Sequence, residues 1–396
     1  MEKGSLSRRE FLFAAAAFAA GACVPRRLYE GAAETGSYNR DGLLRLTEIP
    51  QQPWIDQRVG VVCVNGVYPR ETGINFFEYG ADVLTNLGFQ TTEIALVPQE
   101  FPAHTGMTIE LGTTLDQLAA RPDVAAVFSH PRIKNVLITT EVSGKGTVNG
   151  WELPVQEAFT PEKLERTYQE YYRFASELLT RYSDGDKEIV ILGTNEIDWK
   201  ALGGTSVDTS TDLTDHAISN SKKYLDAYLT AIRDANMNHS GKKPLRAAVE
   251  INRVRDIWDG NRRILNAVIP FLEVQPDIIA YSAYDTLDKG TLFPQALDTI
   301  RKYAPGSEIV ISEFGKPENR TDAVSMGREG VAELYRQRIQ ECLDAGIKYF
   351  MTWQLTDNEC DIANPNNDQC NGFWMVRPDG SLSDNYRTIR QNFAQS

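Results

Sequence analysis

The sequence predicts an α/β protein in which eight strands alternate with helices and close into a single-domain (β/α)8 TIM barrel. Short apolar runs, typical of buried strands, alternate with stretches whose apolar residues recur with the period of a helix. The region that holds these eight units, residues 43–396, has the length of a barrel with long loops. An open dinucleotide-binding sheet would need a glycine-rich loop after its first strand, where Val64-Asn65-Gly66-Val67 offers one glycine.

The eight predicted strands are short, apolar and rich in β-branched residues. Alternation with helices implies that they run parallel, and eight such units favour a closed barrel. We expect them at residues 58–64, 91–97, 135–141, 188–192, 245–251, 278–284, 308–311 and 349–353.

The predicted helices fill the gaps between these strands. The clearest start is Thr160-Pro161, a hydroxyl cap followed by proline at the first helical position. Gly88 and Gly346 follow apolar-periodic stretches and are natural helix stops. We expect helices near 74–87, 115–120, from 161 onward, 218–235, 331–343 and 386–393.

The first residues resemble an export signal rather than part of the fold. Ser7-Arg8-Arg9-Glu10-Phe11-Leu12 precedes an apolar run over 13–20, which predicts a twin-arginine signal peptide at residues 1–22 and export in the folded state. That run is shorter than the about 20 residues of a membrane span. Residues 23–42 lack periodicity and are expected to form a tether. We therefore expect the protein in the periplasm or cell envelope.

Cysteine usage agrees with an oxidising compartment. Ala20-Gly21-Ala22-Cys23 fits both a signal peptidase site and a lipoprotein box, so Cys23 is a candidate for lipidation, which would tether the protein to a membrane. Cys360 and Cys370 bracket a polar loop and are expected to form a disulfide. Cys342 lies in phase with the apolar face of a predicted helix, which favours a buried thiol.

Composition excludes several classes of function. With 41 basic against 54 acidic residues the net charge is −13, which argues against nucleic-acid binding. The four histidines lack the spacing of a catalytic zinc site, and no Gly-x-Ser-x-Gly elbow is present. We expect no metal and no cofactor; a calcium ion at Asp357, Asp361 or Asp368 has no supporting ligand spacing.

Two acidic motifs carry the chemistry. Asn195-Glu196 closes the fourth predicted strand and Ser312-Glu313 follows the seventh. The C-terminal strand ends of such a barrel converge on the active site. Cleavage of a glycosidic bond needs one carboxyl that gives a proton and another that attacks the sugar or activates water. Glu196 and Glu313 are therefore the predicted catalytic pair, whereas Glu141 and Glu250 are expected to be solvated or salt-bridged.

Asn195-Glu196 on the fourth strand, Glu313 on the seventh and Trp353 on the eighth together resemble the retaining glycoside hydrolases of clan A, of cellulase or mannanase type. The resemblance implies that Glu196 is the acid/base, that Glu313 is the nucleophile and that Asn195 binds the sugar 2-hydroxyl. It also implies that Tyr284 touches the nucleophile and that Trp353 forms the floor of the sugar site.

Trp151 and Trp199 follow predicted strands, where aromatic rings could stack on a sugar. Two departures from the clan A pattern stand out. The second strand reads Thr92-Glu93-Ile94 without the arginine that often supports the nucleophile, and the third ends without a histidine or tryptophan. Arg253 or Arg255 are the candidate replacements.

The sequence thus predicts a monomeric retaining glycosidase that acts on β-linked polysaccharides or oligosaccharides. The alternative is a non-catalytic barrel lipoprotein that binds polysaccharide in the cell envelope. Release of reducing ends distinguishes the first from the second. The sugar, the linkage and the choice between endo and exo action stay open.

Overall fold

The computed structural model describes residues 51–62, 76–99, 101, 109–110, 112–142, 144–183, 185–208, 210–286, 289–357 and 370–395. The predicted signal peptide and tether, Cys23 and Cys360 lie outside the described residues.

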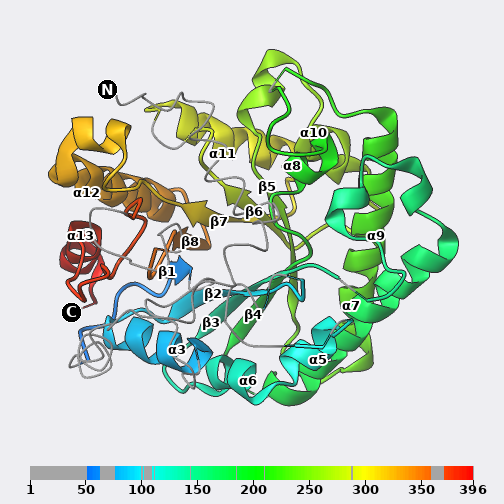
Figure 1. The fold of residues 1–396 in the computed structure, drawn as a ribbon, viewed down its shortest axis with the longest axis horizontal. Helices are drawn as coiled ribbons and strands as arrows, with labels where there is room; N and C mark the ends of the chain where they lie inside the picture. The colour runs from blue at the N-terminus through cyan, green and yellow to red at the C-terminus, as the bar shows by residue number, and fades with distance from the viewer. Residues whose placement is uncertain are drawn as a thin grey trace, which may run out of the picture.

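Eight parallel strands form a closed barrel in the order of the sequence, which confirms the predicted fold class. Figure 1 shows the strands at the centre with helices around them. Wherever the structure describes them, all the predicted strands are present, and each observed strand end lies within three residues of the predicted end. The strands are β1 (Val59–Val62), β2 (Thr91–Leu96), β3 (Asn135–Thr140), β4 (Glu188–Leu192), β5 (Arg246–Ile251), β6 (Ile278–Ser282), β7 (Glu308–Phe314) and β8 (Tyr349–Thr352).

The helices include all the predicted ones and others that the sequence analysis missed. The long helix after β3 begins at Pro161, and the Thr160 hydroxyl accepts a hydrogen bond from Lys163 N, as expected of this cap. The helices are α3 (Phe76–Asn86), α5 (Leu115–Ala119), α6 (Pro122–Ser129), α7 (Pro161–Tyr182), α8 (Ile197–Leu202), α9 (Asp215–Asn238), α10 (Ile264–Ala267), α11 (Leu292–Tyr303), α12 (Thr321–Asp344) and α13 (Asp384–Phe393), with short 3-10 turns η2 (Gly150–Glu152), η3 (Gln156–Ala158), η4 (Arg255–Asp259) and η5 (Ile269–Phe271).

Side chains alternate along each strand between the barrel interior and the surrounding helices. One buried cluster fills the interior and includes Leu137, Val190, Ala248, Ala280 and Val310. Their strand neighbours belong to the larger cluster that packs under the helices. Residues in phase with the interior set, at the C-terminal ends of the strands, therefore point into the mouth of the barrel.

Strand β7 departs from this alternation. Tyr281 pairs with Ile311, yet the next residue, Ser282, pairs with Glu313, so β7 carries one extra residue. The register against β8 shifts over the same stretch of β7. This is a β-bulge, which lets Ser312 and Glu313, although consecutive, both reach into the barrel.

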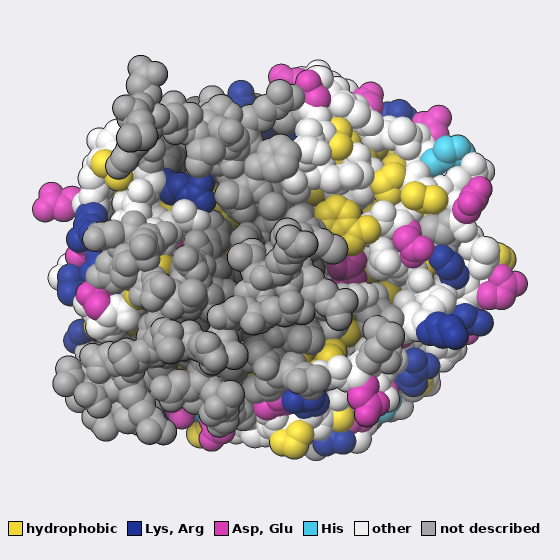
Figure 2. All heavy atoms as spheres, viewed as in Figure 1, with side chains coloured by type: hydrophobic (Ala, Val, Ile, Leu, Met, Phe, Trp, Pro, Cys, Tyr) yellow, Lys and Arg dark blue, Asp and Glu magenta, His cyan; other side chains and the backbone are white. Residues whose placement is uncertain are grey.

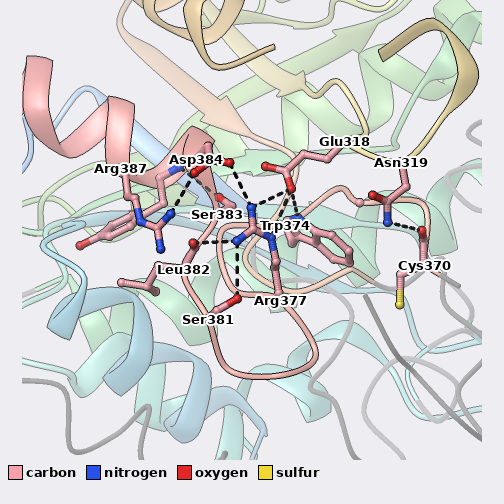
Figure 3. A network of polar contacts seen from close by, with 12 residues as sticks. Glu318, Asn319, Cys370, Trp374, Arg377, Ser381, Leu382, Ser383, Asp384 and Arg387 are labelled. Atoms are coloured by element: carbon pink, nitrogen blue, oxygen red, sulfur yellow. Dashed lines mark hydrogen bonds and ion pairs between the residues drawn. The ribbon is translucent and has the colours of Figure 1, made fainter. Parts of the chain in front are cut away.

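The C-terminal segment is fastened to the loop after β7 by a buried ion pair (Figure 3). Glu318 Oε2 lies 3.1 Å from Arg377 Nη2 and accepts a hydrogen bond from Trp374 Nε1 at 2.8 Å. Arg377 Nη1 also donates to the Leu382 carbonyl at 3.0 Å. Helix α13 follows this segment and closes the chain beside α12 (Figure 1).

The described cysteines are Cys342 and Cys370. Cys342 is free and buried, as predicted, and burial raises the pKa of its thiol well above the usual value. Cys370 is disulfide-bonded. Its partner lies outside the described residues, as does Cys360, so their pairing stays a prediction.

Within the described part of the chain, no helix is long and apolar enough to cross a bilayer. Figure 2 shows acidic and basic side chains interspersed around the described rim of one face.

Candidate active site

Glu196 stands in an unusual backbone position just beyond β4. Its φ of 43° lies in the left-handed region and is the only positive φ of a described residue other than glycine. Such a conformation costs free energy, and residues that adopt it cluster at active sites. Preceding it, Gly193 has no room for a side chain, because a Cβ would lie 2.6 Å from the Tyr228 ring. The strand end is thus shaped to turn Glu196 into the barrel mouth.

The two predicted catalytic carboxyls meet at one hydroxyl. Ser282 Oγ donates to Glu196 Oε1 at 3.0 Å and lies 3.5 Å from Glu313 Oε2. Both glutamates are 4 % exposed. Because Ser282 Oγ contacts both carboxyls, the distance between Glu196 Oε1 and Glu313 Oε2 cannot exceed the sum of these two distances.

Glu250 is a third carboxyl in the same place. It is 1 % exposed and lies on the interior face of β5. Its Oε2 accepts a hydrogen bond from Glu196 N at 2.8 Å, and its Oε1 accepts one from Ser312 Oγ at 2.6 Å. The expectation that Glu250 is solvated or salt-bridged is therefore wrong. Glu141 does form an ion pair, with Lys200, as expected.

Glu93 of β2 is the fourth buried carboxyl, at the strand where an arginine was expected from the clan A pattern. It is 2 % exposed, and its Oε1 accepts a hydrogen bond from Thr139 Oγ1 at 2.6 Å. Its other oxygen is buried with no hydrogen-bond partner among the described residues. We call Glu93, Glu196, Glu250 and Glu313 the carboxyl cluster.

Burial raises the pKa of every member of the carboxyl cluster. Desolvation and the negative charge of Glu250 raise the pKa of Glu196 to about 8, and the same two causes raise the pKa of Glu93 to about 8. The pKa of Glu313 is raised well above its usual value by burial and then by Glu196 and Glu250. Glu250 has the lowest of these values, a pKa of about 7, because Ser312 and Glu196 N hydrogen-bond to its carboxylate.

Lys200 of α8 supplies positive charge near this cluster. Its Nζ lies 3.0 Å from Glu141 Oε2, 2.9 Å from Thr194 Oγ1 and 5.6 Å from the centre of the Trp151 ring. Its charge lowers the pKa values of Glu196 and Glu250 in opposition to burial.

Arg253 and Arg255 do not replace the absent arginine. Arg253 pairs with Asp256 at 2.6 Å and lies over the Trp199 ring at 4.4 Å. Arg255 is exposed. Among the described residues neither guanidinium forms an ion pair with Glu313, so this sequence-based expectation is wrong.

The predicted sugar-binding residues fall into two groups. Trp353, 7 % exposed, packs in the interior cluster directly beyond β8, and the partly buried Tyr284 packs against that cluster. Asn195 is partly exposed beside Glu196. Trp151 is partly buried on η2, with Lys200 against its ring. Trp199 is also buried, and it differs because the Arg253 guanidinium covers one face of its ring, so that this face cannot stack on a sugar.

Besides Glu93 and Glu250, three polar residues of the site were not predicted from the sequence. Ser282 is in phase with Ile278 and Ala280 on the interior face of β6, which was a usable signal. Ser312 reaches the interior with Glu313 only because of the bulge, which no sequence pattern announced. Asn252 is 4 % exposed and lies beside Glu196, whose pKa it lowers. Its amide atoms form no well-aligned hydrogen bond with a described residue.

The described residues contain no group of three or more His, Cys, Asp or Glu side chains arranged to hold a metal ion. Asp357, one of the candidates for calcium, instead accepts a hydrogen bond from Gly372 N at 2.6 Å. Asp361 and Asp368 lie outside the described residues.

No model of a known protein family matches the chain, and no curated protein is similar enough in sequence to match. The solved structures that share its architecture include two family 5 enzymes. A family 5 glycoside hydrolase from Streptomyces cattleya, in complex with Manβ1-4GlcNAc, superposes with a TM-score of 0.54 at 14 % identity over 85 % of this chain and 80 % of its own. A family 5 xyloglucanase from Paenibacillus pabuli gives 0.51 at 12 % identity over 88 % and 99 %. The chain therefore has the same (β/α)8 barrel fold as these two glycoside hydrolases.

Proposed function

We propose that the protein is a retaining glycosidase that cleaves β-glycosidic bonds, with Glu196 as acid/base and Glu313 as nucleophile. The observation that carries this proposal is the Ser282 hydroxyl, which lies 3.0 Å from one carboxyl and 3.5 Å from the other. Retaining enzymes hold their two carboxyls about 5 Å apart, whereas inverting enzymes leave a gap of about 6.5–9.5 Å for water. Contact with a common hydroxyl favours the shorter separation.

In the first step Glu313 attacks the anomeric carbon while the glycosidic C–O bond breaks and Glu196 gives its proton to the leaving oxygen. A pKa of about 8 keeps Glu196 protonated at neutral pH for this role. Burial and the neighbouring carboxyls oppose ionisation of Glu313 in the empty site. The positive charge that develops on the sugar beside Glu313 acts in the other direction and stabilises its carboxylate.

In the second step Glu196, now ionised, removes a proton from water, and the water attacks the anomeric carbon of the glycosyl–Glu313 ester. The bond to Glu313 breaks, so the product keeps the β configuration. Glu196 ends protonated and Glu313 ionised, ready for another cycle.

The substrate is a β-linked polysaccharide or oligosaccharide. Trp353 would lie beneath the sugar ring, Tyr284 would contact the nucleophile, and Asn195 would hydrogen-bond the 2-hydroxyl. Apolar faces of sugars stack on aromatic rings, which gives Trp353 and Trp151 this role.

The test uses purified protein produced without residues 1–22 and a panel of β-glucan, mannan, xylan and galactan. Proton NMR of the first products should show the β anomer before mutarotation. An initial α anomer would remove Glu313 from the nucleophile role. Oligosaccharide binding by calorimetry with no release of reducing ends would instead support the non-catalytic binding protein. That alternative is favoured by the lack of an arginine paired with Glu313 among the described residues.

We also propose twin-arginine export to the periplasm or cell envelope, with Cys23 as the lipidation site. Cell fractionation of the full chain and of the Cys23→Ser variant tests this. Labelled palmitate in the full chain, lost together with membrane association in Cys23→Ser, would support lipidation. Equal fractionation of the two proteins would exclude it.

A further inference from the structure

Glu250 contacts both strand ends that carry the proposed catalytic residues. One carboxylate oxygen accepts a hydrogen bond from the backbone N–H of Glu196, and the other accepts one from the Ser312 hydroxyl. Glu196 follows β4, and Ser312 belongs to the bulge of β7 that also carries Glu313. Glu250 itself comes from β5, so a single side chain bridges elements that are distant in sequence.

Each of these contacts stabilises a local backbone conformation that the sequence of the segment does not by itself favour. The left-handed conformation of Glu196 is unfavourable for an L-residue and persists only where its surroundings fix it. A bulge leaves backbone and side chains outside the regular ladder of a strand. Hydrogen bonds to an ionised acceptor are stronger than neutral ones, which suits a carboxylate to this task.

Glu250 is buried more deeply than the two proposed catalytic glutamates, which are each 4 % exposed. It is 1 % exposed, and both of its oxygens already accept a hydrogen bond. Whatever it contributes must pass through Glu196 and Glu313.

We propose that Glu250 is a positioning residue that fixes the separation of the two catalytic carboxyls by holding the Glu196 backbone and the Ser312 side chain at the same time. This inference rests on the proposed function and adds to it a third carboxyl with a distinct role. The reaction class it serves is glycosyl transfer through a covalent intermediate, in which a displacement of about 1 Å costs about 100-fold in rate.

The test compares Glu250→Gln with Glu250→Ala. Glutamine keeps the geometry, because its carbonyl oxygen can accept from Glu196 N while its NH2 group donates to Ser312 Oγ. We expect Glu250→Ala to lower kcat at least about 100-fold with KM changed less than about threefold, and Glu250→Gln to recover most of that loss. Equal kcat values for Ala and Gln would overturn the proposal.

The pH profile gives a second measurement. The negative charge of Glu250 raises the pKa of Glu196, so its removal in Glu250→Gln lowers that pKa. Above its pKa the acid has no proton to give, so the alkaline limb of kcat/KM should move to lower pH by about one unit. An unmoved limb would contradict the electrostatic contact between Glu250 and Glu196.

Ser312→Ala isolates one of the two contacts. We expect a loss of about tenfold in kcat from it alone and no further loss when it is added to Glu250→Ala, since both remove the same link. Full additivity would show that the link does not exist. If Glu250→Ala fails to fold, the shift of the alkaline limb in Glu250→Gln and the loss of kcat in Ser312→Ala decide the question.

Glu170 provides the matched control. It is 1 % exposed and also accepts backbone hydrogen bonds from two segments, Leu115 N at 3.3 Å and Gly144 N at 3.0 Å. Glu170→Gln should leave the pH profile unchanged. Failure of the wild-type protein to cleave any β-glycan would count against the proposed function, whereas cleavage that is indifferent to Glu250 would count against this inference alone.

Discussion

Glu313 and Glu318 lie five positions apart in the sequence, are both buried, and have opposite surroundings. Glu318 Oε2 lies within 3.1 Å of Arg377 Nη2 and accepts a hydrogen bond from Trp374 Nε1, as Figure 3 shows. Glu313 has a serine hydroxyl at 3.5 Å and the repulsion of three other carboxyls.

A buried carboxylate is costly unless it is paired, so the two sites represent two ways of meeting the same cost. Glu318 gains an arginine and fastens the C-terminal segment. No arginine pairs with the carboxyl cluster among the described residues, and burial raises the pKa values of its members, a feature that is common at functional sites. The difference implies that substitutions at Glu313 affect rate, whereas substitutions around Glu318 affect stability.

The largest expected effect comes from Glu313→Gln. We expect turnover to fall at least about 1000-fold, because the amide cannot form the covalent intermediate, while oligosaccharide affinity changes only a few-fold. Initial rates and titration calorimetry measure the two quantities. Glu318→Gln is the matched variant and should keep kcat within about twofold. Unchanged turnover in Glu313→Gln would refute the nucleophile assignment.

Arg377→Ala tests the other half of the comparison. It leaves the buried Glu318 carboxylate without its cation, so the free energy of unfolding should fall by about 3–5 kcal/mol. Urea unfolding measures this change. Arg387→Ala removes an exposed ion pair with Asp384 and should cost less than about 1 kcal/mol. Equal losses in the two variants would show that burial of the Glu318 pair is irrelevant.

The pH dependence of stability should also follow from the carboxyl cluster. The folded pKa values of Glu93 and Glu196 are about 8 and that of Glu250 is about 7, against an ordinary value of 4.5. Between pH 4.5 and about pH 8 the unfolded chain loses protons that the folded chain keeps. The contribution of these carboxyls to the free energy of unfolding is therefore complete below about pH 4.5 and is lost as pH rises to about 8.

Thermal unfolding at pH 5 and at pH 8 measures this difference. We expect the higher midpoint at pH 5, and a smaller difference in Glu93→Gln, which lacks one of the titrating groups. A higher midpoint at pH 8 in the wild type would mean that the cluster is ionised in the folded protein.

Ser282→Ala should have the smallest effect. Removal of the hydroxyl withdraws a hydrogen bond that lowers the pKa of Glu196, so the alkaline limb of kcat/KM should shift to higher pH and kcat should fall by about tenfold or less. Ser381→Ala is the corresponding change beside Arg377 and should alter neither. A shift toward lower pH would contradict the described contact.

The sequence was sufficient for the barrel and for the placement of Glu196. Strand β4 was predicted with its observed bounds, because its apolar run ends sharply at Gly193. Helix α11 was missed although Phe293, Leu297 and Ile300 repeat with helical spacing. Helix α8 was missed because six residues are too few to establish a period.

The carboxyl cluster was only half predictable. Glu250 shares the interior face of β5 with Ala248, but alternation shows which way a side chain points and not whether it meets a cation. The expected replacement of the arginine by Arg253 failed because Asp256, three residues later, pairs with that guanidinium. Such pairing depends on three-dimensional placement, which one sequence does not show.

The bulge in β7 determines how this site could be transferred to another barrel. Each residue advances a strand by about 3.3 Å, and successive residues face opposite sides. Without the extra residue, the position of Glu313 would point outward beneath the helices, as Ile311 does. To transfer the nucleophile to an eight-stranded barrel without this bulge, both Ser312 and Glu313 must be introduced, as an insertion of one residue and not as a single substitution.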